Sequence, residues 1–176
     1  MRVLTRLFAM TLFAASLLGC ASKYTEMDTV EYVDIDRFMG PWYVIANIPT
    51  FLERDAYNAV ENYTLNADGT IATIFTFRKG SVDGKQKEYR PKGFVLDSES
   101  NALWGMRFVW PIKADYRIVY VADDYSTTIV ARQNRDFVWI MARTSTVSDQ
   151  DYEQLVSFVE AIGYDVSKLK RVPQQW

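Results

Sequence analysis

The chain has 176 residues, and its 20 basic and 22 acidic side chains give a formal net charge of −2. This weak negative charge, with no basic stripe, offers no electrostatic basis for binding nucleic acid. Histidine is absent and Cys20 is the only cysteine, which removes the Ser-His-Asp and Cys-His catalytic sets and the usual nitrogen and sulfur zinc ligands. We therefore expect no enzymatic activity, no metal site and no cofactor.

The N-terminus has the pattern of a bacterial export signal. Arg2 and Arg6 precede an uncharged run over residues 7–18, which is shorter than the roughly 20 apolar residues that span a bilayer. Residues 17–20, Leu-Leu-Gly-Cys, resemble the lipobox of bacterial lipoproteins. The resemblance implies cleavage before Cys20 and its acylation with fatty acyl chains such as palmitate, which together hold a protein firmly on a membrane. Ala21 in place of Asp favours the outer membrane, with the domain on its periplasmic face.

Short β-branched and aromatic runs alternate with turn signals through the middle of the chain. They predict strands at residues 42–48, 57–65, 70–78, 85–96, 102–109, 116–121, 126–132 and 137–143. A helix follows, with Ser148 as its N-cap and Gly163 as its stop, and a short tail strand is expected around residues 169–172. The sequence therefore predicts an all-β fold: an eight-stranded antiparallel up-and-down barrel with one C-terminal α-helix packed outside.

Several predicted strands carry large aromatic side chains at every second position, as in Ile71-Ala72-Thr73-Ile74-Phe75-Thr76-Phe77. Two interpretations are open. The aromatic face is either a well-filled core or the lining of a cavity, in which Tyr63, Tyr116 and Glu61 would fix the head group of a ligand.

Three motifs in order resemble the lipocalin family. Residues 40–43, Gly-Pro-Trp-Tyr, are similar to its Gly-x-Trp-Tyr opening, residues 121–125 to the segment joining its sixth and seventh strands, and residues 139–144 to its last barrel strand. Residues 48–54 and 62–65 look most like the bacterial outer-membrane lipocalins and apolipoprotein D. The likeness covers about residues 33–172. We expect a signal peptide at 1–19, an acylated Cys20 with a polar tether at 20–31, and a lipocalin domain at 32–176.

The resemblance implies roles for individual residues. Trp42 and Arg143 would form the cation–π pair at the closed end of the barrel, and Gly40 would permit a close backbone approach there. These three residues are structural. The candidate ligand-binding residues come from family positions and strand parity: Tyr63, Phe75, Phe77, Met106, Phe108, Tyr116 and Trp139.

Glu61 has the inward parity of its strand, where a small or apolar residue is expected. An isolated carboxylate in a dry cavity is unfavourable. Glu61 therefore lies near the mouth, pairs with a cationic head group, or sits where the register bends. We expect the first.

Taken with the resemblance, these patterns predict a lipoprotein that binds a small hydrophobic ligand, such as a fatty acid or lysophospholipid, in envelope lipid storage, transport or stress. Two alternatives remain: a lipid-modifying enzyme, or an interaction lipoprotein whose aromatic band of Trp104, Trp110 and Tyr116 forms an exposed patch. A homodimer is left open.

Overall fold

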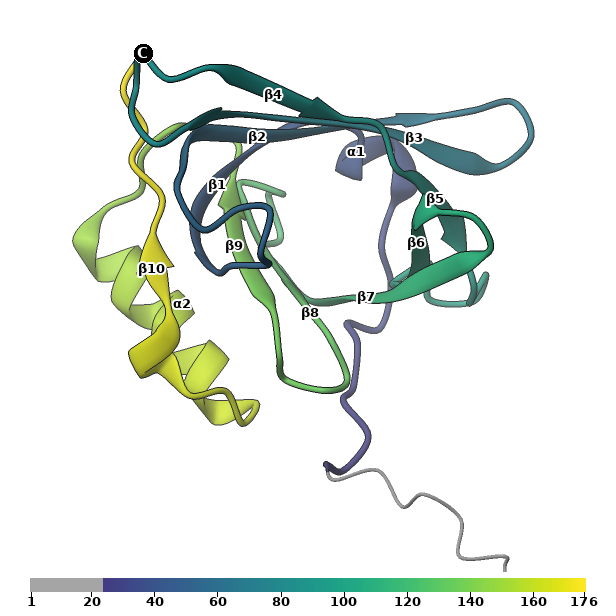
Figure 1. Ribbon diagram of the computed structural model, residues 1–176. Helices are drawn as coiled ribbons and strands as arrows, with labels where there is room; N and C mark the ends of the chain where they lie inside the picture. Colours follow the sequence, from purple (N-terminus) through teal and green to yellow (C-terminus); the bar gives the residue numbers. More distant parts are fainter. Residues whose placement is uncertain (1–23) are drawn as a thin grey trace, which may run out of the picture.

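The computed structural model describes residues 24–176, so Cys20 and the predicted signal peptide lie outside the described residues. One antiparallel sheet curls into a ring, and a helix covers one side of it (Figure 1). The strands are β1 (Gly40–Ile48), β2 (Ala56–Leu65), β3 (Thr70–Lys79), β4 (Gln86–Tyr89), β5 (Lys92–Val95), β6 (Leu103–Val109), β7 (Ile112–Val121), β8 (Thr127–Ala131), β9 (Val138–Ala142) and β10 (Lys170–Arg171). The helices are α1 (Ile35–Phe38), α2 (Asp149–Ala161) and the 3₁₀ turn η1 (Val166–Lys168).

The sheet is a closed barrel. The strands pair in chain order from β1 to β9, except that β4 and β5 both pair with β3 and not with each other. β9 pairs back onto β1, from Tyr43 opposite Ala142 to Ile48 opposite Val138. The predicted strand 85–96 is interrupted at Pro91, which has no N–H for a ladder, so β4 and β5 are two halves of one strand that pair with β3 in the same register. With these halves counted together, the predicted eight-stranded barrel is confirmed.

Two local expectations are wrong. β7 begins at Ile112 rather than Tyr116, and a register shift between Ile118 and Tyr120 turns Tyr120 outward onto Phe158 of α2, 5.5 Å between ring centroids. A bulge of this kind inserts one residue and reverses the parity beyond it. Strict alternation would place Tyr116, Ile118 and Tyr120 on the inner face, but only the first two belong to the interior core.

The predicted exposed aromatic band is also wrong. Trp104 and Tyr116 lie inside the barrel, at 0% and 5% exposure, and their rings stack at 5.4 Å. Of the three residues, only Trp110 is exposed, at 78%. The β6–β7 hairpin that carries it is strongly apolar on its surface.

The polar tether expected before residue 32 is packed against the barrel from its first described residues. Thr25 O accepts hydrogen bonds from Gln133 and Arg135, Met27 is 3% exposed, and Val30 N donates to Ile118 O. We call residues 24–33 the N-terminal strap. Because Gln133 and Arg135 stand in the β8–β9 loop, the strap starts beside that loop and runs along the wall towards α1.

The barrel has a core on each side of its wall. Inside, aromatic side chains from β1, β2, β6 and β7 fill the end nearest α1. Outside, alternate residues of β1, β8 and β9 pack against α2, whose Leu155 and Val159 are buried. Ser148 caps α2 by accepting from Asp151 N, and β10 pairs with β1 beyond the helix, as predicted.

Residues 24–176 include the closed barrel, both cores and the covering helix, which is what a chain needs to fold as a domain. Within residues 24–176, no helix is both long enough and apolar enough to span a bilayer.

The closed end is sealed by Trp42 and Arg143. The Arg143 guanidinium lies 3.7 Å from the centroid of the Trp42 ring and donates to Arg37 O at 2.6 Å and Pro41 O at 2.9 Å. The Trp42 indole N–H donates to Phe38 O at 2.8 Å, which fixes α1 over the end of the barrel. Gly40 has a φ of +91° beside the guanidinium, a conformation that favours glycine.

We predict that Arg143→Ala lowers the free energy of unfolding by about 2 kcal/mol, because it removes a shielded cation–π contact and two charge-assisted hydrogen bonds. Urea unfolding of the domain measures the change. Arg54→Ala, at an exposed loop position, is the matched control and should change stability by less than about 0.5 kcal/mol. An Arg143→Ala variant as stable as the control would contradict the role of this pair.

Candidate functional site

The barrel holds a cavity of about 380 Å³ at the end opposite α1. Four segments form its mouth: the β1–β2 loop, the β6–β7 hairpin, the start of β7 and the β8–β9 loop. The lining residues are Thr50, Phe51, Leu52, Glu53, Glu61, Phe75, Pro91, Met106, Phe108, Val109, Ile112, Ala114, Asp115, Tyr116, Arg132, Phe137 and Trp139. Most of these side chains are apolar. The polar ones lie either at the floor of the cavity or around its mouth.

A chain of hydrogen bonds forms the floor of the cavity. Glu61 of β2 accepts from the Tyr63 hydroxyl, and the Tyr63 and Tyr116 hydroxyl oxygens are 2.6 Å apart. Tyr63 has one proton, which it donates to Glu61, so Tyr116 of β7 donates to Tyr63. Below this chain, Tyr63 packs against Phe38 and Trp104 of the closed end.

The depth of Glu61 differs from the sequence-based expectation. Register places Glu61 opposite Trp42, two pairs above Tyr63 opposite Gly40, and therefore directly above the sealed end. Part of the Glu61 side chain is uncovered, but that part faces the cavity. The expectation that Glu61 lies near the mouth is wrong, because it lies at the floor.

Removal from bulk water changes the proton affinity of these groups. Burial raises the pKa of Glu61 from its ordinary value of 4.5 to about 7, against the Tyr63 hydrogen bond, which lowers it. The negative charge of Glu53 raises it further. Burial also holds the pKa values of Tyr63 and Tyr116 well above 10, so both phenols keep their protons.

Glu53 anchors the β1–β2 loop over one side of the mouth. Its carboxylate accepts from Asn47 Nδ2 at 2.9 Å, Thr50 Oγ1 at 2.9 Å and Trp139 Nε1 at 2.8 Å. Burial raises the pKa of Glu53, while these three donors lower it. Glu53 is therefore a satisfied buried acid that ties the loop to the wall.

The rim of the mouth carries exposed apolar side chains. Phe51 projects from the β1–β2 loop at 76% exposure, and Val109, Trp110 and Ile112 of the β6–β7 hairpin are 68%, 78% and 69% exposed. Lys113 follows directly, its ammonium 4.0 Å from the Phe94 ring centroid. Scattered exposed apolar residues are ordinary, but a cluster at one end of the molecule marks an interaction surface.

The predicted ligand-binding residues divide into two groups. Phe75, Met106, Phe108, Tyr116 and Trp139 line the cavity. Tyr63 lies beneath it, in contact with Glu61 and Tyr116. Phe77 is 2% exposed, stacks on Tyr89 at 6.1 Å and does not line the cavity.

Sequence reasoning missed the lining contributed by loops. Glu53 and Phe51 stand between the predicted strands 42–48 and 57–65, where strand parity has no meaning, and Arg132 is the last residue of the predicted strand 126–132. Only the charge of Glu53 in an otherwise apolar stretch, Ile48-Pro49-Thr50-Phe51-Leu52, offered a signal. Ala114 was missed because the start of β7 was placed after it.

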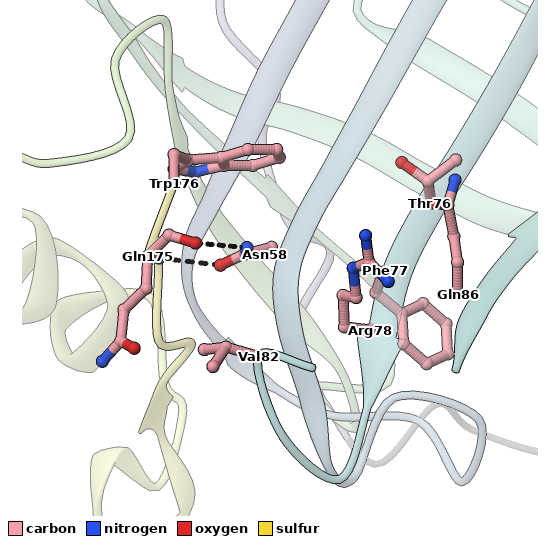
Figure 2. Close-up of a pocket in the computed structure, with 8 residues that line it drawn as sticks. All are labelled: Asn58, Thr76, Phe77, Arg78, Val82, Gln86, Gln175 and Trp176. Carbon is pink, nitrogen blue, oxygen red and sulfur yellow. Dashed lines mark hydrogen bonds between the residues drawn. The ribbon is translucent and has the colours of Figure 1, made fainter. Parts of the chain in front are cut away.

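A second pocket of about 320 Å³ lies outside the barrel, between β2, the β3–β4 hairpin and the C-terminal tail (Figure 2). Asn58 holds the tail there, donating to Gln175 O at 2.5 Å and accepting from Gln175 N at 2.7 Å. Its other walls are Thr76, Phe77, Arg78, Val82, Gln86 and Trp176, so polar and apolar side chains are mixed. The predicted ligand-binding residue Phe77 therefore lines this outer pocket and not the barrel cavity. No three His, Cys, Asp or Glu side chains within residues 24–176 are placed to hold a metal ion.

We predict that Glu61→Gln stabilises the domain above neutral pH. The pKa of Glu61 is raised in the folded state, so the folded protein binds more protons than the unfolded chain between pH 4.5 and about 7, and stability falls as pH rises through that range. Relative to the native chain, the variant should gain up to about 3 kcal/mol between about pH 4.5 and pH 8. Urea unfolding across this pH range measures it. Glu153→Gln, on the exposed face of α2, should show no such gain.

Comparisons with known proteins agree with this architecture. A family model described as a lipocalin-like domain matches residues 33–174. The temperature-induced lipocalin-1 of Arabidopsis thaliana is 31% identical over 161 residues, covering 85% of this chain and 83% of that protein. The outer membrane lipoprotein Blc of Escherichia coli K12 is 29% identical over 179 residues, covering 99% and 98%.

Solved structures show the same fold at low identity. Insecticyanin from the tobacco hornworm Manduca sexta superposes with a TM-score of 0.66 at 13% identity, covering 84% of each chain. Apocrustacyanin C2 superposes with a TM-score of 0.64 at 14% identity, covering 81% of this chain and 80% of its own. With a family model across most of its length and a closed eight-stranded barrel sealed by Trp42 and Arg143, the chain belongs to the lipocalin family.

Proposed function

We propose that this protein binds single-chain amphiphiles, the class that includes fatty acids and lysophospholipids, in its barrel cavity, and that it performs no catalytic step. The observation that carries the proposal is the cavity of about 380 Å³, walled by Phe75, Met106, Phe137 and other apolar side chains. Burying an alkyl chain contributes about 0.8 kcal/mol per methylene. About a dozen buried carbons support micromolar binding after association costs of several kcal/mol.

We also propose that acylated Cys20 holds the domain at the periplasmic face of the outer membrane, with the mouth of the barrel facing the lipid. Two observations support this orientation. The N-terminal strap begins at the β8–β9 loop, where Thr25 is bonded to Gln133 and Arg135, so the chain leaves the domain at the open end. The exposed Phe51, Trp110 and Ile112 stand at that same end, where aromatic side chains favour the boundary of a bilayer.

This arrangement would let a ligand pass between bilayer and cavity without crossing water. The relatives named outer membrane lipoprotein Blc are similar to this chain over nearly its whole length, which supports the assignment of the compartment. Storage, transport or a response to envelope stress would all use this one binding step.

We predict that Ala114→Trp weakens ligand binding at least about tenfold, because Ala114 lines the cavity and an indole there occupies the space of an alkyl chain. Displacement of a fluorescent fatty-acid probe from the soluble chain that begins at residue 21 measures the affinity. Ala67→Trp, in the exposed β2–β3 turn, is the matched control and should bind as the native chain does. Equal affinity in both variants would show that the probe binds elsewhere.

We predict that replacing Trp110 and Ile112 by Ser weakens binding of the same soluble chain to lipid vesicles by about tenfold, since it removes two exposed apolar groups from the rim. Co-sedimentation with phosphatidylethanolamine–phosphatidylglycerol vesicles gives the partition constant. Trp176→Ser removes an equally exposed tryptophan, at 74%, whose ring packs on Tyr43 along the outer wall. This control should partition as the native chain does, and a loss as large as that of the rim variant would contradict the proposed orientation.

A further inference from the structure

The floor of the cavity presents hydrogen-bond acceptors and no free donor. Tyr63 donates its proton to Glu61, and Tyr116 donates its proton to Tyr63. What remains facing the cavity is a carboxylate oxygen of Glu61 and the lone pairs of Tyr116. Among the described residues, no donor other than Tyr63 reaches the Glu61 carboxylate. A ligand group that reaches this floor must supply a hydrogen to satisfy it.

The charged residues around the cavity also favour a ligand group that donates hydrogen bonds or carries positive charge. The titratable residues that line it are three acids, one phenol and one base: Glu53, Glu61, Asp115, Tyr116 and Arg132. The single base, Arg132, stands in the β8–β9 loop at the mouth, where it is 3.3 Å from Asp136. The residues opposite Glu61 on the neighbouring strands are Trp42 of β1 and Phe75 of β3, and both are uncharged. No cation therefore approaches Glu61 from the wall.

The two glutamates of the cavity differ in the number of hydrogen bonds that they accept from the protein. Glu53 accepts three hydrogen bonds from the protein and needs nothing from a ligand. Glu61 accepts one, and its remaining capacity is directed at the space that a ligand would fill. A buried acceptor without a donor carries a desolvation penalty of about 1–3 kcal/mol, and more when it is charged. A donor on the ligand would remove that penalty.

We propose that the cavity selects single-chain amphiphiles that carry a hydrogen-bond donor at one end, above all a primary ammonium group, and that this end binds Glu61 and Tyr116 at the floor. The inference rests on the proposed function, since it names the ligand class of the same cavity. It orients the ligand with its polar end at the sealed end of the barrel and its chain along Phe75 and Met106 towards the mouth. An anionic end group at the floor would face the Glu61 carboxylate.

Protonation of Glu61 reverses the direction of the hydrogen bonds at the floor. Burial raises the pKa of Glu61 to about 7, so that below this pH the carboxyl group carries its own proton. It can then donate to Tyr63, which frees the proton of Tyr116 to point into the cavity. The floor then offers a donor in place of an acceptor. Selection for an ammonium group should therefore strengthen as pH rises through about 7 and weaken as it falls.

The test compares three probes of equal chain length, hexadecylamine, hexadecanol and palmitate, as competitors of an uncharged fluorescent dye in the soluble chain from residue 21. At about pH 8 we expect hexadecylamine to bind at least about tenfold more tightly than palmitate, as a charge-assisted hydrogen bond predicts, with hexadecanol between them. At about pH 6 the advantage of the amine should shrink by about tenfold, although its ammonium stays protonated throughout.

Two variants assign the effect to Glu61. Glu61→Gln keeps the shape of the side chain but not its charge, so it should bring the affinities for amine and palmitate to within about threefold of each other and abolish the change with pH. Glu153→Gln, on the solvent side of α2, should leave both intact. Tyr116→Phe removes the second acceptor together with the hydrogen bond to Tyr63, leaves the Glu61 carboxylate in place, and should reduce the preference for the amine about threefold. Thermal unfolding verifies that each variant is folded.

The possible failures are separable. If none of the three probes displaces the dye, the cavity does not bind amphiphiles, and the proposed function falls with this inference. If all three displace it equally, or if Glu61→Gln retains the preference for the amine, the selection proposed here is wrong while the binding function stands.

Discussion

The pairing of β9 with β1 is the constraint on which the rest of this molecule depends. Closure gives every strand two neighbours and leaves one face of each with no access to bulk solvent. Those inner side chains must either fill the interior or enclose space. At the end near α1 they fill it, because Phe38, Trp42, Tyr63 and Trp104 meet there and Arg143 seals the edge. At the other end the barrel encloses the cavity, which is lined by strand residues such as Phe75, Met106 and Trp139 and by the loops around its mouth.

Much of the barrel could be predicted from the chain because its evidence is local. Turn residues separate the strands, alternate positions distinguish inside from outside, and a capping serine starts the helix, so the number and order of the strands followed without any knowledge of tertiary contacts. The errors come from places where one residue changes the pattern. Pro91 divides a strand that looked continuous, and the bulge after Ile118 turns Tyr120 towards α2.

The site was harder to predict than the fold because depth is a property of the closed barrel and not of any strand. Parity assigned Glu61 correctly to the inside. Its height above the sealed end follows from the register of β2 against β1, which places it beside Trp42, and no local pattern encodes that register. The same holds for Glu53, whose partner Trp139 is 86 residues away in the chain. Two glutamates eight positions apart thus differ in their surroundings: Glu53 fastens a loop, and Glu61 faces the cavity with one hydrogen-bond donor from the protein.

If the protein is anchored at Cys20 as proposed, the N-terminal strap has a mechanical consequence. Its hydrogen bonds to Gln133, Arg117 and Ile118 are spaced along the wall from the open end towards the closed end. A pull on residue 24 directed away from the mouth acts parallel to the strap, so these bonds are strained together in shear and do not break one after another. Tension between membrane and domain would then be distributed over the length of the barrel before it reached any strand of the ligand cavity.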